Sequence, residues 1–219
     1  MFTKVDEVLP KKVNANFVLK TLETYLMPND TNQPSKPYPP TRAGKPPRLG
    51  LALGSGGAKG WAHVGVLKAL DELGIEADVY AGCSAGALVS GAKLLGILDE
   101  LKEWAMNIGP MGAVTAFGVQ LSRGGLINPD KAFGQFARYD LPIETLSSPW
   151  GAVATDLATG LEVWLTEGST LNACRASSAV PLVLQAASHT IDDDEHWLID
   201  GGVANPVPVN LARALGADR

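Results

Sequence analysis

The sequence predicts a three-layer α/β/α domain in which helices cover both faces of a mostly parallel central sheet. Two apolar segments of strand type, at residues 49–53 and from residue 79, each lead into a glycine-rich turn and then an apolar helix. This repeated order of strand, turn and helix is typical of parallel strands joined by helical crossovers. The composition agrees, because 46% apolar and 19% charged residues are usual for a globular protein. A chain of 219 residues is long enough for one sizeable core.

An N-terminal extension is expected to precede this domain. Residues 1–27 could form one amphipathic helix, which either packs on the domain or binds an interface or a partner. Residues 28–47 are rich in proline, which excludes regular structure and indicates a linker. We therefore place the extension with its proline-rich linker at 1–47 and the folded domain at 48–219.

The first part of the domain is expected to begin with a strand at 49–53 that is buried on both faces. A glycine loop at 54–60 follows it, and the helix at 61–73 comes next. This helix should end at Gly74, because glycine readily adopts the left-handed conformation that closes a helix. The inward stripe of the helix is expected to consist of Val64, Leu67, Leu70 and Leu73.

The second part of the domain should alternate helices with further strands. A glycine-rich apolar stretch at 109–125 is interpreted either as a mobile segment at a pocket mouth or as an ordered surface loop. The expected helices lie at 99–106, 128–136, 171–178 and 209–215, and the expected strands at 151–156, 161–165 and 197–199.

The composition also argues against several kinds of partner and site. A net charge of −5 argues against a nucleic-acid partner, which needs clustered lysine and arginine. Cys83 and Cys174 form no CxxC pair, so we expect neither a zinc site nor a disulfide, and two core thiols in a reducing compartment. The N-terminus lacks the apolar region of a secretory signal, and no run reaches the about 18 apolar residues of a membrane span. We expect a cytoplasmic protein, with peripheral membrane contact left open.

The segment Gly82-Cys83-Ser84-Ala85-Gly86 fits a very tight turn between the second strand and a buried helix expected at 85–98. Such a turn strains the backbone of Ser84 and crowds the flanking positions, where glycine has no side chain to clash. The turn raises the hydroxyl above the sheet at a helix N-terminus, where free N–H groups favour negative charge. This is suitable for a nucleophile in acyl transfer. The alternatives are a turn without chemistry and, much less favoured, Cys83 as the nucleophile.

Three features coincide at the carboxyl ends of predicted strands: the glycine loop at 54–60, Ser84, and the segment 200–202. In open parallel sheets, ligands bind at that edge. The N–H groups of the glycine loop are unshielded and could stabilise the charge that develops on an ester carbonyl oxygen. The loop does not fit a nucleotide site. A phosphate loop needs serine or threonine after Lys59, and a dinucleotide loop starting at Gly54 needs glycine at that position.

A serine nucleophile needs a proton acceptor, and the three histidines fit this role poorly. His63 lies on the helix after the glycine loop, and His189 and His196 lie near an acidic run at 192–195 that is expected to be a solvated turn. None of them follows Asp200, so that aspartate cannot complete the order of serine, acid and histidine found in α/β-hydrolases. Asp200 is the better acceptor, because it follows an apolar strand and the next two glycines leave room for a substrate. Taken alone, it would be interpreted as a turn or cap aspartate.

These segments together resemble the patatin-like phospholipase family over residues 49–219, and the resemblance lies in residues 50–60, 82–86, 153–157 and 200–208. It implies that 48–219 is a patatin-like catalytic domain with the α/β/α fold shared by lysophospholipases and acyl-carrier transacylases. It also implies Ser84 as nucleophile, Asp200 as proton acceptor and an oxyanion hole from backbone N–H groups around Gly56 and Gly57. Supporting positions are expected at Lys59, Gly82, Gly86, Gly201 and Gly202.

The reaction implied by the resemblance is hydrolysis of acyl esters in phospholipids, lysophospholipids or neutral lipids through an acyl-serine intermediate, with no metal or cofactor. An acyltransferase with the same nucleophile and a non-catalytic lipid-binding or regulatory module are the alternatives. The chain departs from many members at Ser55, where they have glycine, and at Leu184-Gln185, where they have Phe-Pro. Members usually continue into another strand beyond Arg219, so C-terminal elements of the domain are expected to be missing here.

Overall fold

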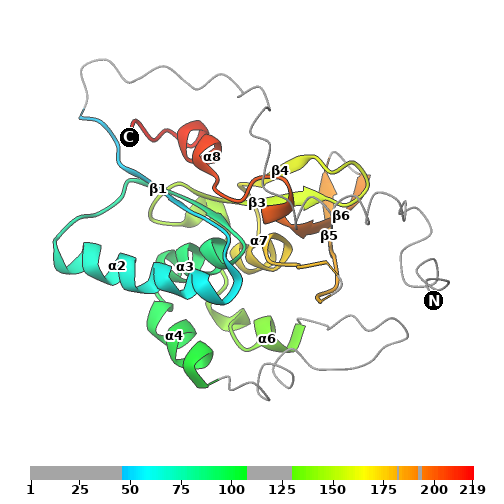
Figure 1. The fold of residues 1–219 in the computed structure, drawn as a ribbon, viewed down its shortest axis with the longest axis horizontal. Helices are drawn as coiled ribbons and strands as arrows, with labels where there is room; N and C mark the ends of the chain where they lie inside the picture. The colour runs from blue at the N-terminus through cyan, green and yellow to red at the C-terminus, as the bar shows by residue number, and fades with distance from the viewer. Residues whose placement is uncertain (1–45, 108–129, 182, 192–193) are drawn as a thin grey trace.

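The computed structural model describes residues 46–107, 130–181, 183–191 and 194–219. Within them a mixed β-sheet lies between layers of helices, which confirms the predicted α/β fold class (Figure 1). The helix expected at 1–27, almost all of the linker at 28–47 and the glycine-rich stretch at 109–125 lie outside the described residues.

The described strands form one sheet with a parallel core and antiparallel extensions. They are β1 (Gly50–Leu53), β2 (Val79–Cys83), β3 (Trp150–Asp156), β4 (Glu162–Leu165), β5 (Ala187–Ile191) and β6 (Asp194–Asp200). β1, β2 and β3 run parallel, whereas β4 and β6 run antiparallel to β3 and β5 runs antiparallel to β6. β1 lies at the end of the strand order, next to β2 alone.

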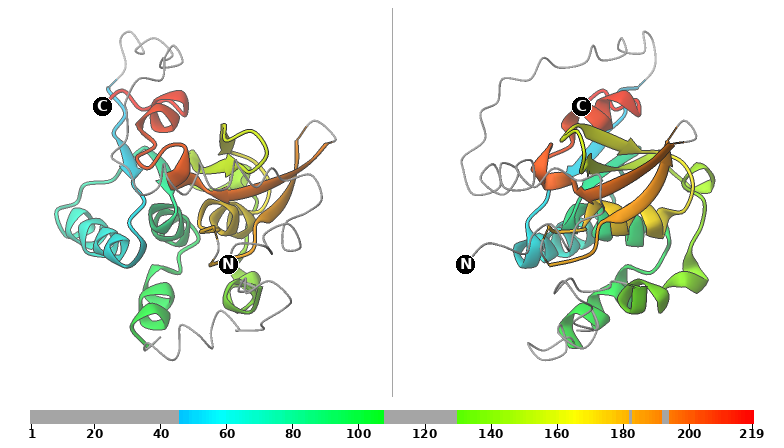
Figure 2. Two further views of the ribbon diagram at one scale, coloured as in Figure 1. Left: turned by 45° about the vertical axis from the view of Figure 1, so that its right-hand side comes forward. Right: turned by 90° about the vertical axis from the view of Figure 1, so that its right-hand side faces the viewer.

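Helices cover both faces of this sheet. The helices are α2 (Ala62–Glu72), α3 (Ala85–Leu94), α4 (Leu98–Asn107), α6 (Asp130–Gly134), α7 (Thr170–Ser177) and α8 (Val209–Ala214), and the 3₁₀ turns are η1 (Gly57–Trp61), η2 (Ala137–Tyr139), η3 (Ile143–Thr145) and η4 (Gly201–Val203). The views agree that α8 lies on one side of the strands and that α3 and α7 lie on the other (Figures 1 and 2).

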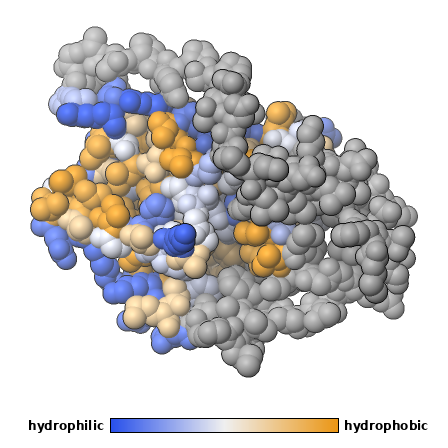
Figure 3. All heavy atoms as spheres, viewed as in Figure 1, coloured by the Kyte–Doolittle hydropathy of each residue, from blue (hydrophilic) through white to orange (hydrophobic). Residues whose placement is uncertain are grey.

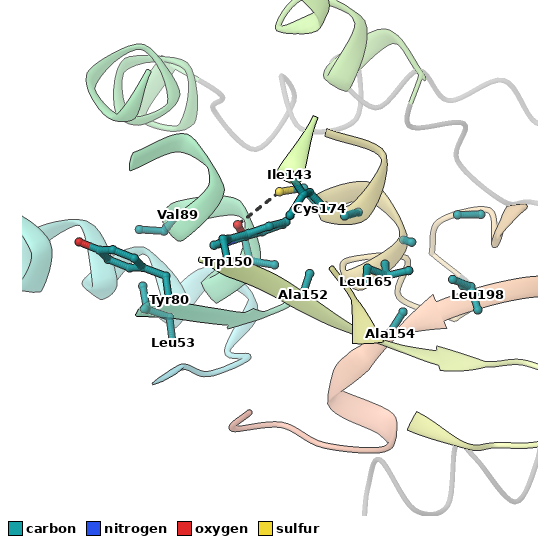
Figure 4. Packing of buried hydrophobic residues seen from close by; sticks show 14 of the residues in the cluster. Leu53, Tyr80, Val89, Ile143, Trp150, Ala152, Ala154, Leu165, Cys174 and Leu198 are labelled. Atoms are coloured by element: carbon teal, nitrogen blue, oxygen red, sulfur yellow. Dashed lines mark hydrogen bonds between the residues drawn. The ribbon is translucent and has the colours of Figure 1, made fainter. Parts of the chain in front are cut away.

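The alternation of side chains along β2 explains these two layers, because successive residues of a strand point to opposite faces. Tyr80 belongs to the same buried cluster as Val89 of α3 and Trp150 of β3 (Figure 4). Val79 belongs to a second cluster, with Leu211 of α8. Both faces of β2 are therefore buried, which places its carboxyl end, and the turn that follows it, inside the domain.

Several predicted elements differ from those observed. β1 was expected to be buried on both faces, but as the end strand it keeps three of its four residues half-buried. α3 ends at Leu94 rather than at 98, because Gly96 adopts a left-handed φ of 71° and breaks the helix. The solvated turn expected at 192–195 is wrong at its end, since Asp194 and Glu195 lie in β6. β5 was not predicted at all.

The inward stripe of α2 is also shorter than predicted. Val64 and Leu67 are buried, but Leu73 lies just beyond the helix with 71% of its surface exposed. It is one of several exposed apolar side chains in this region, with Val66 and Ile75. The surface over α2 is accordingly largely hydrophobic in Figure 3.

The difference in burial between Leu67 and Leu73 predicts different effects of the two side chains on stability. Leu67→Ala is expected to lower the free energy of unfolding by about 2–5 kcal/mol, because it leaves a cavity where a side chain with only 2% exposure was packed. Leu73→Ala is the matched control and should change it by less than about 0.5 kcal/mol. Urea unfolding of both variants measures the two values, and equal losses would contradict the observed orientation of α2.

Candidate active site

The turn between β2 and α3 is as tight as the sequence predicts. Ser84 precedes the first residue of α3 and has φ 53° and ψ −119°, the only positive φ of a non-glycine residue in the described ranges. A Cβ on Gly82 would lie 2.4 Å from Cα of Ala87, and a Cβ on Gly86 would lie 2.0 Å from the carbonyl oxygen of Leu53. No side chain fits at either position, so both glycines are required for β1, β2 and α3 to approach this closely.

Ser84 and Asp200, which are 116 positions apart in the sequence, are in direct contact. The hydroxyl of Ser84 donates a hydrogen bond of 2.6 Å to Oδ2 of Asp200. The other carboxylate oxygen, Oδ1, accepts a bond of 2.7 Å from the N–H of Gly202. Ser84 is 5% exposed and Asp200 is fully buried. The carboxylate is thus oriented with one oxygen on a backbone donor and the other on the serine.

The strand pairing around β3 explains why these residues meet. β4 pairs with both Val153 and Ala154, so it occupies one edge of β3 over this stretch. Cys83 of β2 pairs with Val153, and Asp200 of β6 pairs with Ala154, so β2 and β6 must share the opposite edge. They run in opposite directions, and their carboxyl ends meet there. The expectation that Asp200 ends a parallel strand is therefore wrong: the meeting requires β6 to be antiparallel.

The glycine loop is held against both parts of this site. At its start, Ser55 donates its N–H to the carbonyl of Pro206 over 2.8 Å, in the segment that follows Asp200. At its end, a Cβ on Gly60 would lie 2.3 Å from Cβ of Ala85, the first residue of α3. Between these anchors Gly56 and Gly57 are exposed, and Gly57 has a left-handed φ of 49°.

The charged side chain expected to support the loop, Lys59, lies on the surface. It is exposed, and its backbone N–H donates to the carbonyl of Gly56 over 3.0 Å. The remaining supporting positions, Gly201 and Gly202, follow Asp200 directly. A Cβ on Gly201 would lie 2.1 Å from the carbonyl oxygen of Val153, so glycine lets the chain cross β3 closely after the aspartate.

Two of the described histidines, His63 and His196, form hydrogen bonds, and in both cases the partner is a residue other than Ser84 or Asp200. Nε2 of His63 lies 2.9 Å from the carbonyl oxygen of Gly54, within the glycine loop. Nδ1 of His196 lies 2.7 Å from Oδ2 of Asp156. Burial, together with the nearby His196, lowers the pKa of His189.

Cys83 is poorly suited to act as a nucleophile. It is fully buried, and burial, followed by the negative charges of Asp200 and Glu162, raises the pKa of its thiol. The thiolate is the reactive form of cysteine, so a raised pKa keeps this side chain inert at neutral pH. Among the described residues, no group of three or more histidine, cysteine or acidic side chains is arranged to hold a metal ion. Of the helices in the same residues, none has the length and hydropathy needed to cross a bilayer.

The hydrogen-bonded contact between Asp156 and His196 predicts a pH effect on stability. Burial acts to raise the pKa of the Asp156 carboxyl, but hydrogen bonds from His196 and Thr159 outweigh it and leave that pKa below its ordinary value. A carboxyl with a lowered pKa in the folded state stabilises the fold above its unfolded pKa of about 3.9. That contribution is lost as the pH falls through the folded pKa.

The free energy of unfolding of the wild type should therefore fall more steeply between about pH 5 and pH 2 than that of Asp156→Asn. Urea titrations across this pH range measure both slopes. Equal slopes would show that Asp156 makes no such contribution.

Comparison with known protein families assigns this chain to one of them. The patatin-like phospholipase family model matches residues 51–213, and the chain belongs to this family. The predicted family is thereby confirmed.

Individual relatives agree with this assignment. An uncharacterized NTE family protein of Mycobacterium tuberculosis is 38% identical over 179 residues, covering 81% of this chain and 49% of the relative. Neuropathy target esterase sws of Drosophila melanogaster is 30% identical over 183 residues, or 77% of this chain and 12% of that protein. Patatin-like phospholipase domain-containing protein 6 of Mus musculus is 30% identical over 180 residues, or 77% and 13%.

The chain spans about half the length of the mycobacterial relative and a smaller share of the animal proteins. Among solved structures, VipD from Legionella pneumophila aligns with 84% of this chain and 52% of its own, with 15% identity and a TM-score of 0.46.

Two residues that contact the Ser84–Asp200 pair were not among the predicted site residues. The hydroxyl of Thr155 donates to the backbone carbonyl of Asp200 over 2.9 Å. The hydroxyl of Ser177 accepts the backbone N–H of Ser84, also over 2.9 Å. Thr155 lies in a segment that carries the family resemblance, but Ser177 lies in none, and only the tertiary structure brings it to the site.

Proposed function

We propose that this protein is a serine lipid acyl hydrolase of the phospholipase A, lysophospholipase or esterase type. The observation that carries the proposal is the 2.6 Å hydrogen bond from the hydroxyl of Ser84 to the carboxylate of Asp200 in a buried, strained turn. A nucleophile in contact with a proton acceptor is the central requirement of acyl transfer through a covalent intermediate. Membership of the patatin-like phospholipase family favours acyl esters of lipids as the substrate class.

In the acylation step, Oγ of Ser84 attacks the carbonyl carbon of the ester while Oδ2 of Asp200 accepts the hydroxyl proton. The negative charge that forms on the carbonyl oxygen is stabilised by backbone N–H groups at Gly56 and Gly57. The N-terminal end of α3 adds a favourable dipole. The tetrahedral intermediate then breaks the bond to the alcohol portion of the lipid, which leaves with the proton held by Asp200.

In the deacylation step, a water molecule takes the place of the alcohol. Asp200 accepts one proton from this water as its oxygen attacks the acyl-serine carbonyl, and the same backbone N–H groups stabilise the second tetrahedral intermediate. When the bond to Oγ breaks, Asp200 returns the proton to Ser84 and the fatty acid is released. Asp200 thus accepts a proton and then releases it in each of the two half-reactions.

A lipid panel tests this proposal. The full chain is incubated with phosphatidylcholine, lysophosphatidylcholine and triacylglycerol in mixed micelles, and released fatty acid is measured against Ser84→Ala. We expect fatty acid from at least one lipid class with the wild type and none above background with the variant. Release that is equal in both would contradict the proposal.

The same reactions separate the two alternatives. A thiol or alcohol acceptor is added, and the acyl product is identified by mass spectrometry. Acyl groups found on the acceptor and not as fatty acid would establish an acyltransferase. Binding of lipid vesicles with no turnover of any ester would establish a non-catalytic module.

A further inference from the structure

The C-terminal end of α7 contacts both members of the proposed catalytic pair. Oγ of Ser177 accepts the backbone N–H of Ser84 over 2.9 Å. The carbonyl oxygen of Ala179 accepts the backbone N–H of Asp200, also over 2.9 Å. Ser177 and Ala179 are fully buried. Two positions only two residues apart in the chain thus bind the backbones of a nucleophile and an acid that are 116 positions apart.

The bond to Ser84 matters because of the conformation that Ser84 adopts. A non-glycine residue with a positive φ is strained, and such a conformation persists only where surrounding contacts impose it. The N–H of Ser84 also lies at the start of α3, where the first amide groups have no partner within the helix. In a buried site, an amide without a partner is costly. The hydroxyl of Ser177 supplies that partner and opposes relaxation of the turn.

α7 is well placed to hold Ser84 because it is itself fixed against α3. The thiol of Cys174 on α7 bonds the carbonyl of Ala87 on α3 over 3.3 Å (Figure 4). A Cβ on Gly91 would lie 2.8 Å from the same sulfur, so the two helices are in close contact there. α7 also packs against β3 and β6, the strands that carry Asp200 and its neighbours. Its last turn is therefore packed between the helix that begins after Ser84 and the strand that ends at Asp200.

We propose that Ser177 is a positioning residue of the hydrolase: its hydroxyl fixes the strained backbone of Ser84 so that Oγ points at Asp200. This inference rests on the proposed function and adds a residue to it. Ser177 does not touch the substrate or move a proton. It acts on the rate through the direction of the nucleophile, because small errors in geometry at a reacting group have large kinetic effects.

The test compares Ser177→Ala with Ser178→Ala. Ser178 is the neighbouring buried serine, directly after α7, but its hydroxyl donates to the carbonyl of Cys174 in α7 and not to Ser84. The kcat and KM for a short-chain nitrophenyl ester are measured, and kcat is expressed per active site titrated with a fluorophosphonate. Ser177→Ala should lower kcat per titrated site by at least about tenfold with KM within about twofold of the wild type. Ser178→Ala should leave both values unchanged.

Normalisation to titrated sites separates positioning from folding. A residue with only a structural role would reduce the number of active sites and leave the turnover of each one at the wild-type value, which would overturn the inference. Equal losses in the two serine variants would also overturn it. Ser177→Cys, which keeps the size of the side chain and a weak acceptor, should fall between the wild type and Ser177→Ala. If Ser177→Ala yields no folded protein, Ser177→Cys decides alone, and wild-type kcat per site overturns the inference.

The outcome is also distinct from failure of the proposed function. If the wild type shows neither ester turnover nor fluorophosphonate labelling that depends on Ser84, the proposed hydrolase is wrong, and the inference about Ser177 falls with it. If the wild type is active and Ser177→Ala has the same kcat per site, only the inference about Ser177 is wrong.

Discussion

Asp200→Asn is expected to lower kcat for a short-chain nitrophenyl ester by about 10⁴-fold, and Ser84→Ala should remove turnover that depends on the active site. Asparagine has nearly the shape of aspartate and keeps an oxygen that can accept the N–H of Gly202. It cannot take the proton of Ser84, so the nucleophile remains a neutral hydroxyl. The loss should therefore be in catalysis and not in folding.

The control for this prediction lies on the same strand. Asp194 is the first residue of β6 and is exposed. Asp194→Asn therefore removes one carboxylate charge at the opposite end of β6 from Asp200. It should retain wild-type kcat. The circular dichroism spectra of all three variants should match that of the wild type. An Asp200→Asn protein with wild-type turnover would show that Asp200 is not the proton acceptor.

Gly86→Ala adds only a methyl group but is expected to lower the free energy of unfolding strongly. The added Cβ would lie 2.0 Å from the carbonyl oxygen of Leu53 and 2.7 Å from that of Gly54. Both contacts are with backbone, which cannot move aside as a flexible side chain could. β1 and α3 would have to separate, and the free energy of unfolding should fall by about 3 kcal/mol or more.

Gly65→Ala is the matched control, because Gly65 also lies in a helix but no atom from outside its own stretch of helix lies within 4 Å of the position of a Cβ. Here alanine should raise the free energy of unfolding by up to about 1 kcal/mol, since glycine is the poorer helix former. Urea unfolding gives both numbers. The two variants should thus change the free energy of unfolding in opposite directions. A stable, active Gly86→Ala protein would contradict the described approach of β1 to α3.

The parts of the fold that could be predicted are those with a local signal. The apolar strand before each glycine turn, and the almost fully apolar helix after Ser84, depend on short-range patterns that tertiary contacts did not override. β5 could not be predicted in the same way, because its residues, Ala-Ser-His-Thr-Ile, are half-buried or exposed for the most part and show no apolar run. Leu73 is exposed because α2 ends at Glu72, so the helical periodicity that predicts an inward position does not reach it.

The candidate site shows the same division. Ser84, Asp200 and the glycine loop could be singled out because each carries a short motif with unusual backbone demands, and the structure brings Ser84 and Asp200 within hydrogen-bond distance. The direction of β6 could not be predicted, since a strand of seven residues has no sequence mark for parallel or antiparallel pairing. Ser177 could not be predicted either, because one serine in a helix carries no information about a partner 93 positions away.

The role of Ser84 as the nucleophile is tested by the site of covalent modification with a fluorophosphonate, located by peptide mass spectrometry. We expect one adduct on Ser84 in the wild type, none on that peptide in Ser84→Ala, and much slower adduct formation in Asp200→Asn. An adduct confined to another serine, or a wild-type protein that forms none while an active serine esterase in the same reaction is fully modified, would contradict it.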